Sequence, residues 1–424
     1  MISKVKPLII RINKSKEGKA LTSNFGYLLL LQIAGYIFPL ITIPYLARII
    51  GVEGFGKIAF AVAVVVWFQT VADWGFNYTA TRDVARNRDN LEKVSEIFSN
   101  VLWARVVLTL LSFMLLMIAI IIIPYFKENQ TILLVTFLLI PGHILFPDWF
   151  FQAMERMKFI TIFNLISKGL FTALVFIFIK DKSDFILQPL FITLGYAISG
   201  LFSMYIVVVK WKVKILPPRP KAIYSTIKSS TDVFINNIMP NLYNSFSVVL
   251  LGFYGGSVST GLLDAGSKFV SIIQQFITLI SRVFFPFLSR RSDKYSIFIK
   301  INLSVSIAGA LTLFFLAPIT IKLFFTQEFY QAIPVLQIMS VSIVFLAISN
   351  AYGVNYMIIQ GYEKELRSIT FFISLIGFVL SFPLIYFYDF IGAAITITFT
   401  RGVLGLSIMY RARTIMKLNV ITLK

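Results

Sequence analysis

The chain has 424 residues, of which 58% are hydrophobic and 14% are charged, whereas soluble globular domains carry about 25% charged residues. Together with a mean hydropathy of +0.83, this composition excludes a soluble globular protein and indicates a polytopic membrane protein. The formal net charge of +20 would suggest a nucleic-acid partner in a soluble chain. In a membrane protein, the enrichment of Lys and Arg in cytoplasmic loops explains it.

The chain contains no Cys and a single His. The first fact excludes disulfides and thiolate catalysis, and together they argue against a transition-metal site. We therefore expect no cofactor, and no nucleic-acid partner. Residues 1–23 are basic, and the apolar run within them is too short for a signal peptide. They predict an uncleaved cytoplasmic tail, either solvated or lying as an interfacial helix on anionic lipid.

Residues 24–90 predict a hairpin of two membrane-spanning helices followed by a polar segment. The run from Phe25 to Ala47 contains no charge, and as a helix it is about 35 Å long, more than the roughly 30 Å hydrocarbon core. A glycine-rich turn, Gly51–Gly56, ends this span. A second apolar run, from Ile58 to Trp74, contains only one charge, that of Asp73. The Arg- and Asp-rich segment that follows fixes the side of the membrane on which the hairpin ends.

Several short motifs lie in this hairpin: Ser-Asn-Phe at 23–25, Tyr-Leu-Ala-Arg-Ile-Ile-Gly at 45–51, Gly-Phe-Gly at 54–56, Asp-Trp-Gly-Phe at 73–76 and Ala-Thr-Arg-Asp at 80–83. With them the chain resembles the polysaccharide flippase (Wzx) family, part of the multidrug, oligosaccharidyl-lipid and polysaccharide exporter (MOP) superfamily. The motif residues singled out by the resemblance are Gly51, Gly56, Gly75 and Arg82. A weaker similarity lies at 232–291.

The resemblance implies a substrate and a setting. Members of the family flip undecaprenyl-diphosphate-linked oligosaccharide units from the cytoplasmic to the periplasmic leaflet of the bacterial inner membrane, for O-antigen or capsule assembly. It also implies a cavity between two six-helix lobes that is lined by spans 1, 2, 7 and 8. Expected partners are this substrate, membrane lipids, and the polymerase and chain-length regulator of the same pathway.

Apolar runs place four more spans in the first half, at 101–123, 131–151, 159–179 and 186–209. The polar, proline-rich stretch 210–230 follows as a cytoplasmic linker. Six spans make up the second half, at 231–254, 258–288, 297–321, 332–358, 368–388 and 390–410, before a basic tail at 411–424. We therefore predict an all-α membrane protein with twelve spans in two lobes, 24–209 and 231–410, similar to the fold of the MATE and other MOP exporters.

The distribution of basic residues predicts the orientation. With both termini in the cytoplasm, the outer side receives only Arg48, Lys57, Lys127, Lys180, Lys182 and Lys322, as the positive-inside rule requires. Because each half has an even number of spans, the halves form a parallel repeat. Gly51-x4-Gly56 and Gly256-x4-Gly261 occupy matching places in the two halves, although chance is an alternative explanation in a chain with 23 glycines.

Charges inside predicted spans are costly and therefore mark function or pairing. Arg105 and Arg282 lie near cytoplasmic helix ends, where we expect their side chains to extend to the interface. The candidate substrate-binding cations are Arg48, Lys168, Lys268, Arg282 and Arg401, and the candidate coupling or ion-pairing carboxylates are Asp73, Asp148 and Asp264. Asp264 and Lys268 are four residues apart, so they either form an ion pair or serve the ligand. Arg48 has the alternative role of an interfacial anchor, and Arg401 lies outside the four cavity-lining spans.

The sequence predicts a transporter and no enzyme. It lacks a phosphate-binding P-loop, and no nucleophile–base or metal-ligand spacing is visible. The surplus of intramembrane cations favours an anionic ligand such as a lipid diphosphate. A cation-coupled multidrug antiporter of the MATE type is the alternative, and it would need an acidic cavity. A membrane polysaccharide polymerase or glycosyltransferase would need a large outer loop, and every predicted outer loop is short.

Overall fold

The computed structural model describes residues 16–288 and 295–422, so most of the predicted N-terminal tail lies outside the described residues. Throughout the described ranges the regular structure is helical, which confirms the all-α class. The first helices are α2 (Lys16–Asp73), α3 (Phe76–Arg86), α4 (Leu91–Ile122), α5 (Pro124–Glu128), α6 (Gln130–Phe137), α7 (Leu139–Leu145), α8 (Asp148–Ala153), α9 (Met157–Phe178), α10 (Leu187–Tyr205) and α11 (Pro220–Ile238). They are followed by α12 (Ser245–Leu288), α13 (Tyr295–Phe324), α14 (Ile333–Ile348) and α15 (Glu363–Thr422).

Shorter helical segments connect or extend these helices. Three are 3₁₀ turns, η1 (Lys182–Ile186), η3 (Met239–Leu242) and η5 (Gln327–Ala332). Two are π-helical, η2 (Ile206–Lys210) at the end of α10 and η6 (Ser349–Ile358) at the end of α14. The expected linker 210–230 is extended only up to the start of α11 at Pro220.

Nine helical runs within the described residues are long and apolar enough to cross a membrane. Three of these runs contain a residue with non-helical backbone angles, namely Gly51, Gly256 and Asp389. At Asp389 the chain folds back, which brings the two halves of α15 together, and Arg411 Nε of one half donates to Glu365 Oε2 of the other at 2.6 Å. If each of these three runs is divided at its break, the nine runs could correspond to the twelve expected spans. The number twelve remains a prediction.

The predicted fourth span, 131–151, is the one that differs most from a continuous helix. The helix is interrupted at Leu138, between α6 and α7, and again before α8. Pro141 lacks an N–H group and its ring clashes with the carbonyl four residues earlier, that of Phe137, where α6 ends. Pro147 has the same effect on the next turn, so two prolines divide this span into three short helices.

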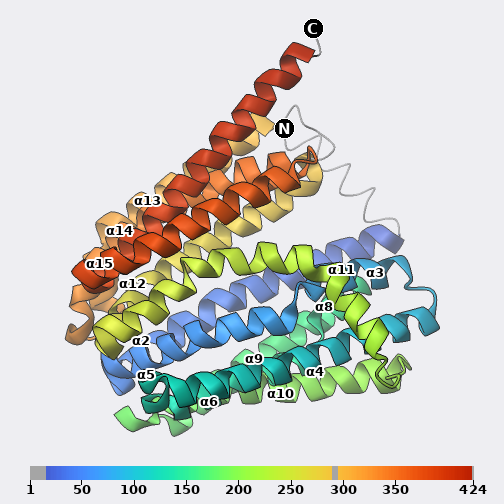
Figure 1. The fold of residues 1–424 in the computed structure, drawn as a ribbon, viewed down its shortest axis with the longest axis horizontal. Coiled ribbons are helices and arrows are strands. Elements are labelled where there is room, and N and C mark those ends of the chain that lie inside the picture. The colour runs from blue at the N-terminus through green and yellow to red at the C-terminus, as the bar shows by residue number, and fades with distance from the viewer. Residues whose placement is uncertain (1–15, 289–294, 423–424) are drawn as a thin grey trace. The chain divides into compact units, whose positions relative to one another are not determined.

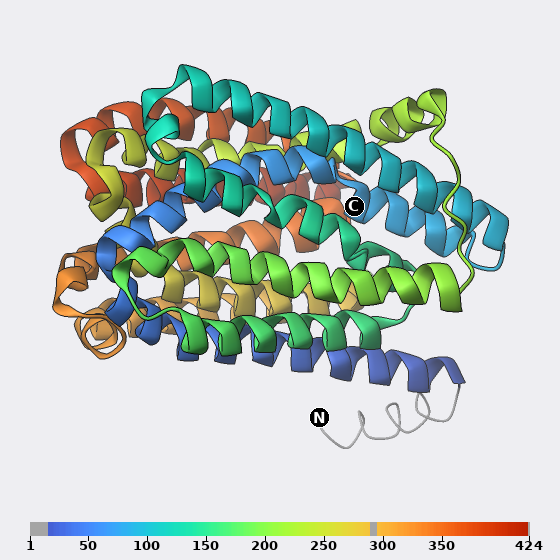
Figure 2. The ribbon, with the colours of Figure 1, turned by 90° about the horizontal axis from the view of Figure 1, so that it is seen from below.

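The chain forms two compact units. The first unit comprises the chain up to Tyr45, together with Phe68–Lys180 and Ile186–Phe234, and in it α9 and α10 pack side by side as the two green helices of Figure 2. The second unit comprises Leu46–Trp67, Asp181–Phe185 and the chain from Ile235 onward. In it α12, α13, α14 and α15, coloured from yellow to red in Figure 1, pack against one another.

The core of the first unit is rich in aromatic side chains, and α8 contributes three of them in succession. Trp149, Phe150 and Phe151 are buried against Phe76 of α3 and Phe98 of α4. The Asp-Trp-Gly-Phe motif is the corner between α2 and α3, where Gly75 has a φ of 79°. Such a left-handed backbone favours glycine.

Trp74, which precedes that glycine, also has a positive φ, of 39°. Its ring stacks on Phe234 with centroids 3.9 Å apart, and its Nε1 donates to Thr231 Oγ1 at 3.4 Å. The motif therefore anchors the corner between α2 and α3 to α11, within the first unit.

Candidate functional site

A polar cavity of about 220 Å³ lies inside the second unit. Its walls come from α2 beyond the Gly51 break and from α12, α14 and α15, and Asn244, which lies between η3 and α12, also lines it. The polar residues that line it are Asn244, Ser245, Asp264, Ser267, Ser271, Gln274 and Arg401. The apolar part of its wall includes Val62, Val66, Val248 and Met339. A cavity with several hydrogen-bonding groups in an otherwise apolar helix bundle is the usual form of a ligand site.

Arg401 of α15 is held by uncharged partners. Its guanidinium donates to Asn244 Oδ1 at 3.0 Å and to Ser342 Oγ at 3.1 Å. Ser342 also accepts a hydrogen bond from Gln274 Nε2, at 3.3 Å. Within the described residues no carboxylate lies within ion-pair distance of Arg401. The network fixes the orientation of the guanidinium and leaves its charge uncompensated.

Asp264 and Lys268 form the ion pair that their spacing allows. Lys268 Nζ lies 2.9 Å from Asp264 Oδ2, and the two side chains are 38% and 22% exposed. The two charges of this pair cancel, so Arg401 leaves the site with a net charge of +1. The charged side chains that line this cavity are Asp264 and Arg401, whereas the sequence-based expectation placed Arg401 outside the cavity-lining spans.

Glycine allows the helices around this cavity to approach closely. Gly51 has φ and ψ of 65° and −176°, and Gly256 has 71° and −165°, a combination essentially restricted to glycine. A Cβ on Gly56 would overlap the carbonyl oxygen of Ser257, and a Cβ on Gly261 would overlap that of Val52. Gly56 lies five residues after Gly51 and meets Ser257, which lies one residue after Gly256. In the same way, Gly261 lies five residues after Gly256 and meets Val52, which lies one residue after Gly51.

These reciprocal contacts give the glycine repeat of the sequence a structural counterpart. Both breaks have the same backbone geometry, and each helix presents its glycine to the other helix's carbonyl. Chance spacing in a glycine-rich chain would not produce matched angles and matched contacts, so a local two-fold relation between the two segments explains the repeat.

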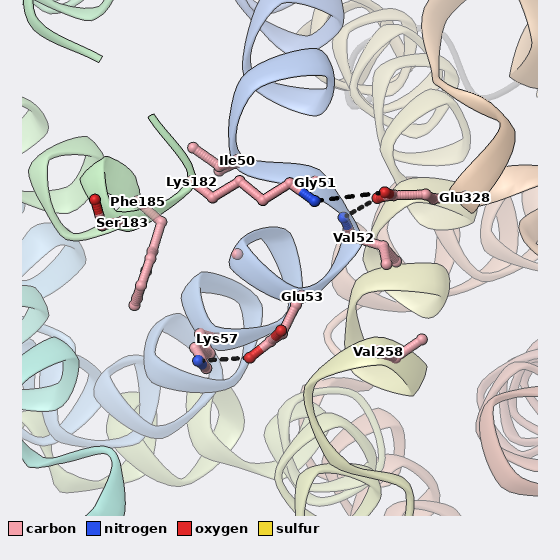
Figure 3. A pocket seen from close by; sticks show the side chains of 11 residues that line it. Ile50, Gly51, Val52, Glu53, Lys57, Lys182, Ser183, Phe185, Val258 and Glu328 are labelled. Atoms are coloured by element: carbon pink, nitrogen blue, oxygen red, sulfur yellow. Dashed lines mark hydrogen bonds and ion pairs between the residues drawn. The ribbon is translucent and has the colours of Figure 1, made fainter. Parts of the chain in front are cut away.

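A second cavity of the second unit, of about 360 Å³, lies beside the Gly51 break (Figure 3). Glu328 Oε2 accepts a hydrogen bond from the backbone N–H of Val52 at 3.3 Å, and its other carboxylate oxygen lies 3.7 Å from Lys182 Nζ. Glu53 pairs with Lys57 at 2.7 Å. The hydrogen bond from Lys57, and then its charge, hold the pKa of the Glu53 carboxyl below its usual value.

Asp73 lies in the first unit, where its partner is Arg105. Arg105 Nη2 donates to Asp73 Oδ1 at 2.6 Å and to Asn77 Oδ1 at 2.8 Å. The Arg105 side chain is only 1% exposed, so the expectation that it extends to the membrane interface is wrong. That expectation considered only the position of Arg105 along its helix, whereas a carboxylate 32 residues earlier compensates its charge inside the fold.

We expect Arg105→Met to destabilise the protein by about 3–5 kcal/mol, because it leaves Asp73 without its cation in a largely buried setting. Adding Asp73→Asn should recover most of this loss. The matched control is Arg82→Ala, since Arg82 pairs with Asp83 at the surface and exposed pairs contribute about 1 kcal/mol or less. Unfolding of the purified protein in detergent measures all three. Equal losses for Arg105→Met and Arg82→Ala would contradict the buried pair.

The remaining predicted site residues lie outside the 220 Å³ cavity. Lys168 of α9 is half-buried, and its ammonium group lies against Gly35 of α2 in the first unit. Asp148 is the first residue of α8, and its carboxylate accepts the backbone N–H of Trp149 at 2.8 Å. Arg48 and Arg282 are exposed. Of the predicted residues, the structure therefore brings Asp264 and Arg401 together, with Lys268 attached to Asp264.

Sequence analysis missed Ser342 and Gln274. A signal for Gln274 exists in the sequence, because Asp264, Ser267, Ser271 and Gln274 recur three or four residues apart and so share one face of α12. No comparable signal marks Ser342. Its role depends on Arg401, which is 59 residues away in the sequence.

Comparison with known proteins places the chain in a family. Residues 21–292 match the family model described as polysaccharide biosynthesis protein. Two curated relatives carry the name "Putative O-antigen transporter". One, from Escherichia coli (strain K12), is 30% identical and aligns over 90% of this chain and 94% of its own length. The other, from Shigella dysenteriae, is 29% identical over 89% of this chain and 96% of its own length.

Solved structures share the fold at low sequence identity. The lipid II flippase MurJ in an inward closed conformation is similar with a TM-score of 0.70 and 16% identity, over 91% of this chain and 87% of that one. An inward-facing multidrug resistance MATE family transporter of the MOP superfamily has a TM-score of 0.62 and 17% identity, over 91% and 98%. The sequence matches and the shared fold together show that this chain is a multi-pass membrane protein of the polysaccharide biosynthesis protein family.

Proposed function

We propose that this chain is a flippase that moves lipid-linked oligosaccharides across a membrane for polysaccharide assembly. The family and the relatives named as O-antigen transporters support this function. The observation that carries it in the structure is Arg401, a cation in a cavity of the helix bundle with no carboxylate partner among the described residues. A buried, uncompensated guanidinium is stabilised when an anion binds, and a diphosphate is the anion that lipid-linked sugars carry.

The size of the cavity indicates which part of the substrate it takes. At about 220 Å³ it is smaller than typical small-molecule sites of about 300–1,000 Å³. It therefore fits a charged group and its immediate neighbour, and the polyprenyl chain and most of the glycan remain outside it. Asn244 and Gln274 lie beside Arg401, where their amides suit the hydroxyl groups of the sugar attached to the diphosphate.

The charge of the cavity disfavours the antiporter alternative. A site for cationic drugs needs more carboxylates than cations, whereas here the single carboxylate, Asp264, is already paired with Lys268. The similarity to MATE transporters is at 17% identity and concerns the fold. Undecaprenyl diphosphate as the lipid, the bacterial inner membrane as the location, and a polymerase and chain-length regulator as partners belong to this proposal.

The proposed orientation has both termini in the cytoplasm and two lobes, 24–209 and 231–410. We expect reporter fusions after Lys127 and Lys182 to be periplasmic and fusions after Arg219 and Arg291 to be cytoplasmic, because basic residues are concentrated on the latter side. Arg291 lies outside the described residues. A reversed result in either half would contradict the parallel arrangement of the two lobes.

Deleting the gene in its host tests the function itself. Without the flippase, lipid-linked oligosaccharide should accumulate in the cytoplasmic leaflet, and a plasmid copy should restore surface polysaccharide. Accumulation of unpolymerised units in the outer leaflet would instead indicate a polymerase.

A further inference from the structure

The segment from Lys210 to Lys221 joins α10 to α11, and we refer to it as the strap. It begins and ends at helical runs that are apolar enough to cross a membrane. Nine residues separate Lys210 from Pro220, and an extended chain advances about 3.3–3.6 Å per residue. The strap therefore remains close to the membrane surface along its whole length, at the end of the first unit where α10 stops.

The strap is fixed to the protein. The backbone N–H groups of Lys214 and Leu216 donate to the hydroxyls of Ser95 and Ser99 of α4, at 3.0 and 2.8 Å. Ser99 Oγ also lies 3.1 Å from the carbonyl oxygen of Lys214, and Trp103 Nε1 donates to that of Leu216 at 2.9 Å. A proline-rich loop that was only a spacer would not need its backbone groups bonded to a neighbouring helix.

Buried side chains hold the first part of the strap. Trp211 packs against the rings of Phe150, Phe151 and Phe159, with centroids 5.5–6.0 Å apart. Val213 is 2% exposed. The lysines on either side of it, Lys212 and Lys214, are exposed, and Lys212 has a positive φ of 57°.

The outward side of the strap is strongly basic. Its exposed cations are Lys210, Lys212, Lys214, Arg219 and Lys221. None of the five forms an ion pair with a described residue. Two exposed apolar side chains lie among or next to them, those of Ile215 at 43% and Tyr224 at 66%. Unpaired cations beside exposed apolar groups at a membrane surface match the chemistry of phospholipid, with its phosphate above an acyl boundary.

We propose that the strap is a binding platform for the headgroups of anionic phospholipids in the leaflet where α10 ends. This surface is separate from the transport cavity, which lies in the second unit, and its occupant is structural lipid of the bilayer. If these cations served only to orient the protein by the positive-inside rule, their charge would be enough, and the strap backbone would not need to be fixed to α4. The four hydrogen bonds between the strap and α4 fix the strap backbone, so that headgroup phosphates meet cations already in place.

The test is titration of the purified full-length protein, in zwitterionic detergent, with phosphatidylglycerol or phosphatidylcholine, followed by thermal unfolding. The wild type should be stabilised saturably by phosphatidylglycerol alone, and added salt should weaken the effect. Each basic residue near an anionic surface strengthens binding about fivefold. Lys212→Gln with Lys214→Gln should therefore raise the apparent Kd on the order of twentyfold.

Two further variants separate the platform from general charge. Lys127→Gln with Lys322→Gln removes two exposed lysines elsewhere and should leave the Kd within about twofold. Ser95→Ala with Ser99→Ala keeps every charge but frees the strap, and it should weaken binding by several-fold. Equal responses to the two lipids, or an unchanged Kd in the Lys212/Lys214 variant, would overturn the proposal. If that variant keeps lipid binding but loses a co-purifying acidic protein, the strap is a protein-docking surface and the lipid platform is wrong.

Discussion

Alanine at Gly56 or Gly261 should leave much less folded protein in the membrane than the wild type. The added Cβ would overlap a backbone carbonyl oxygen of the facing helix, that of Ser257 or Val52. Backbone cannot rotate away as a side-chain end can, so the two helices must separate along their contact. Overpacking of this kind costs about 1–3 kcal/mol or more, and valine should be worse than alanine at both positions.

The control for this prediction is Gly169→Ala in α9. Apart from the adjacent residues and backbone of α9 itself, no atom lies within 4 Å of the Cβ that this substitution adds, and alanine favours a helix by about 1 kcal/mol over glycine. It should be neutral or slightly stabilising. Yield of monodisperse protein and the unfolding midpoint in detergent compare the variants. Gly56→Ala and Gly261→Ala should be affected alike, and a result equal to that of Gly169→Ala would contradict the close reciprocal approach.

Arg401→Gln should abolish export of lipid-linked oligosaccharide while the protein still folds. Gln keeps hydrogen-bonding groups toward Asn244 and Ser342 but removes the charge, so the site with Asp264 and Lys268 becomes neutral overall. Arg401→Lys should retain part of the activity, since a lysine keeps the charge but loses the planar fork that binds phosphate oxygens in pairs.

The ion pair beside Arg401 supplies the matched variants. Lys268→Gln alone leaves an unpaired carboxylate in the cavity and should impair export, because that carboxylate repels an anionic ligand and offsets Arg401. Asp264→Asn together with Lys268→Gln keeps the net charge of the site and should restore most of the export. Complementation of the deletion strain, with the amount of membrane-inserted protein measured in parallel, reads out each variant. Normal export by Arg401→Gln would show that the diphosphate binds elsewhere.

Much of the fold was predictable because spans and ion pairs within one helix are local properties of the sequence. Apolar length indicated an all-helical membrane protein, and a spacing of four residues placed Asp264 beside Lys268. The glycine repeat at Gly51 and Gly256 was visible too, because both positions have backbone angles that only glycine readily adopts.

Contacts between distant segments were not predictable in this way. Arg401 meets Asn244, 157 residues earlier, only because α15 folds back at Asp389, a non-glycine residue with a φ of 51°. Ser259 Oγ donates to the Asp389 carboxylate at 2.6 Å and helps to hold that turn. Neither residue stands out in the sequence. Arg105 is a second example of a contact that the sequence did not reveal. Its position within an apolar run indicated how far it lies from the helix end, but not that Asp73 on another helix is its partner.

Reconstitution tests the proposed function most directly. Purified protein would be placed in liposomes with undecaprenyl-diphosphate-linked oligosaccharide in both leaflets, and an impermeant sugar-modifying enzyme would be added outside. If the chain is a flippase, nearly all of the substrate in wild-type liposomes should become accessible to the enzyme over time. In protein-free and Arg401→Gln liposomes, only the substrate of the outer leaflet should be accessible. Exposure by the wild type that never exceeds the protein-free level would contradict the flippase function.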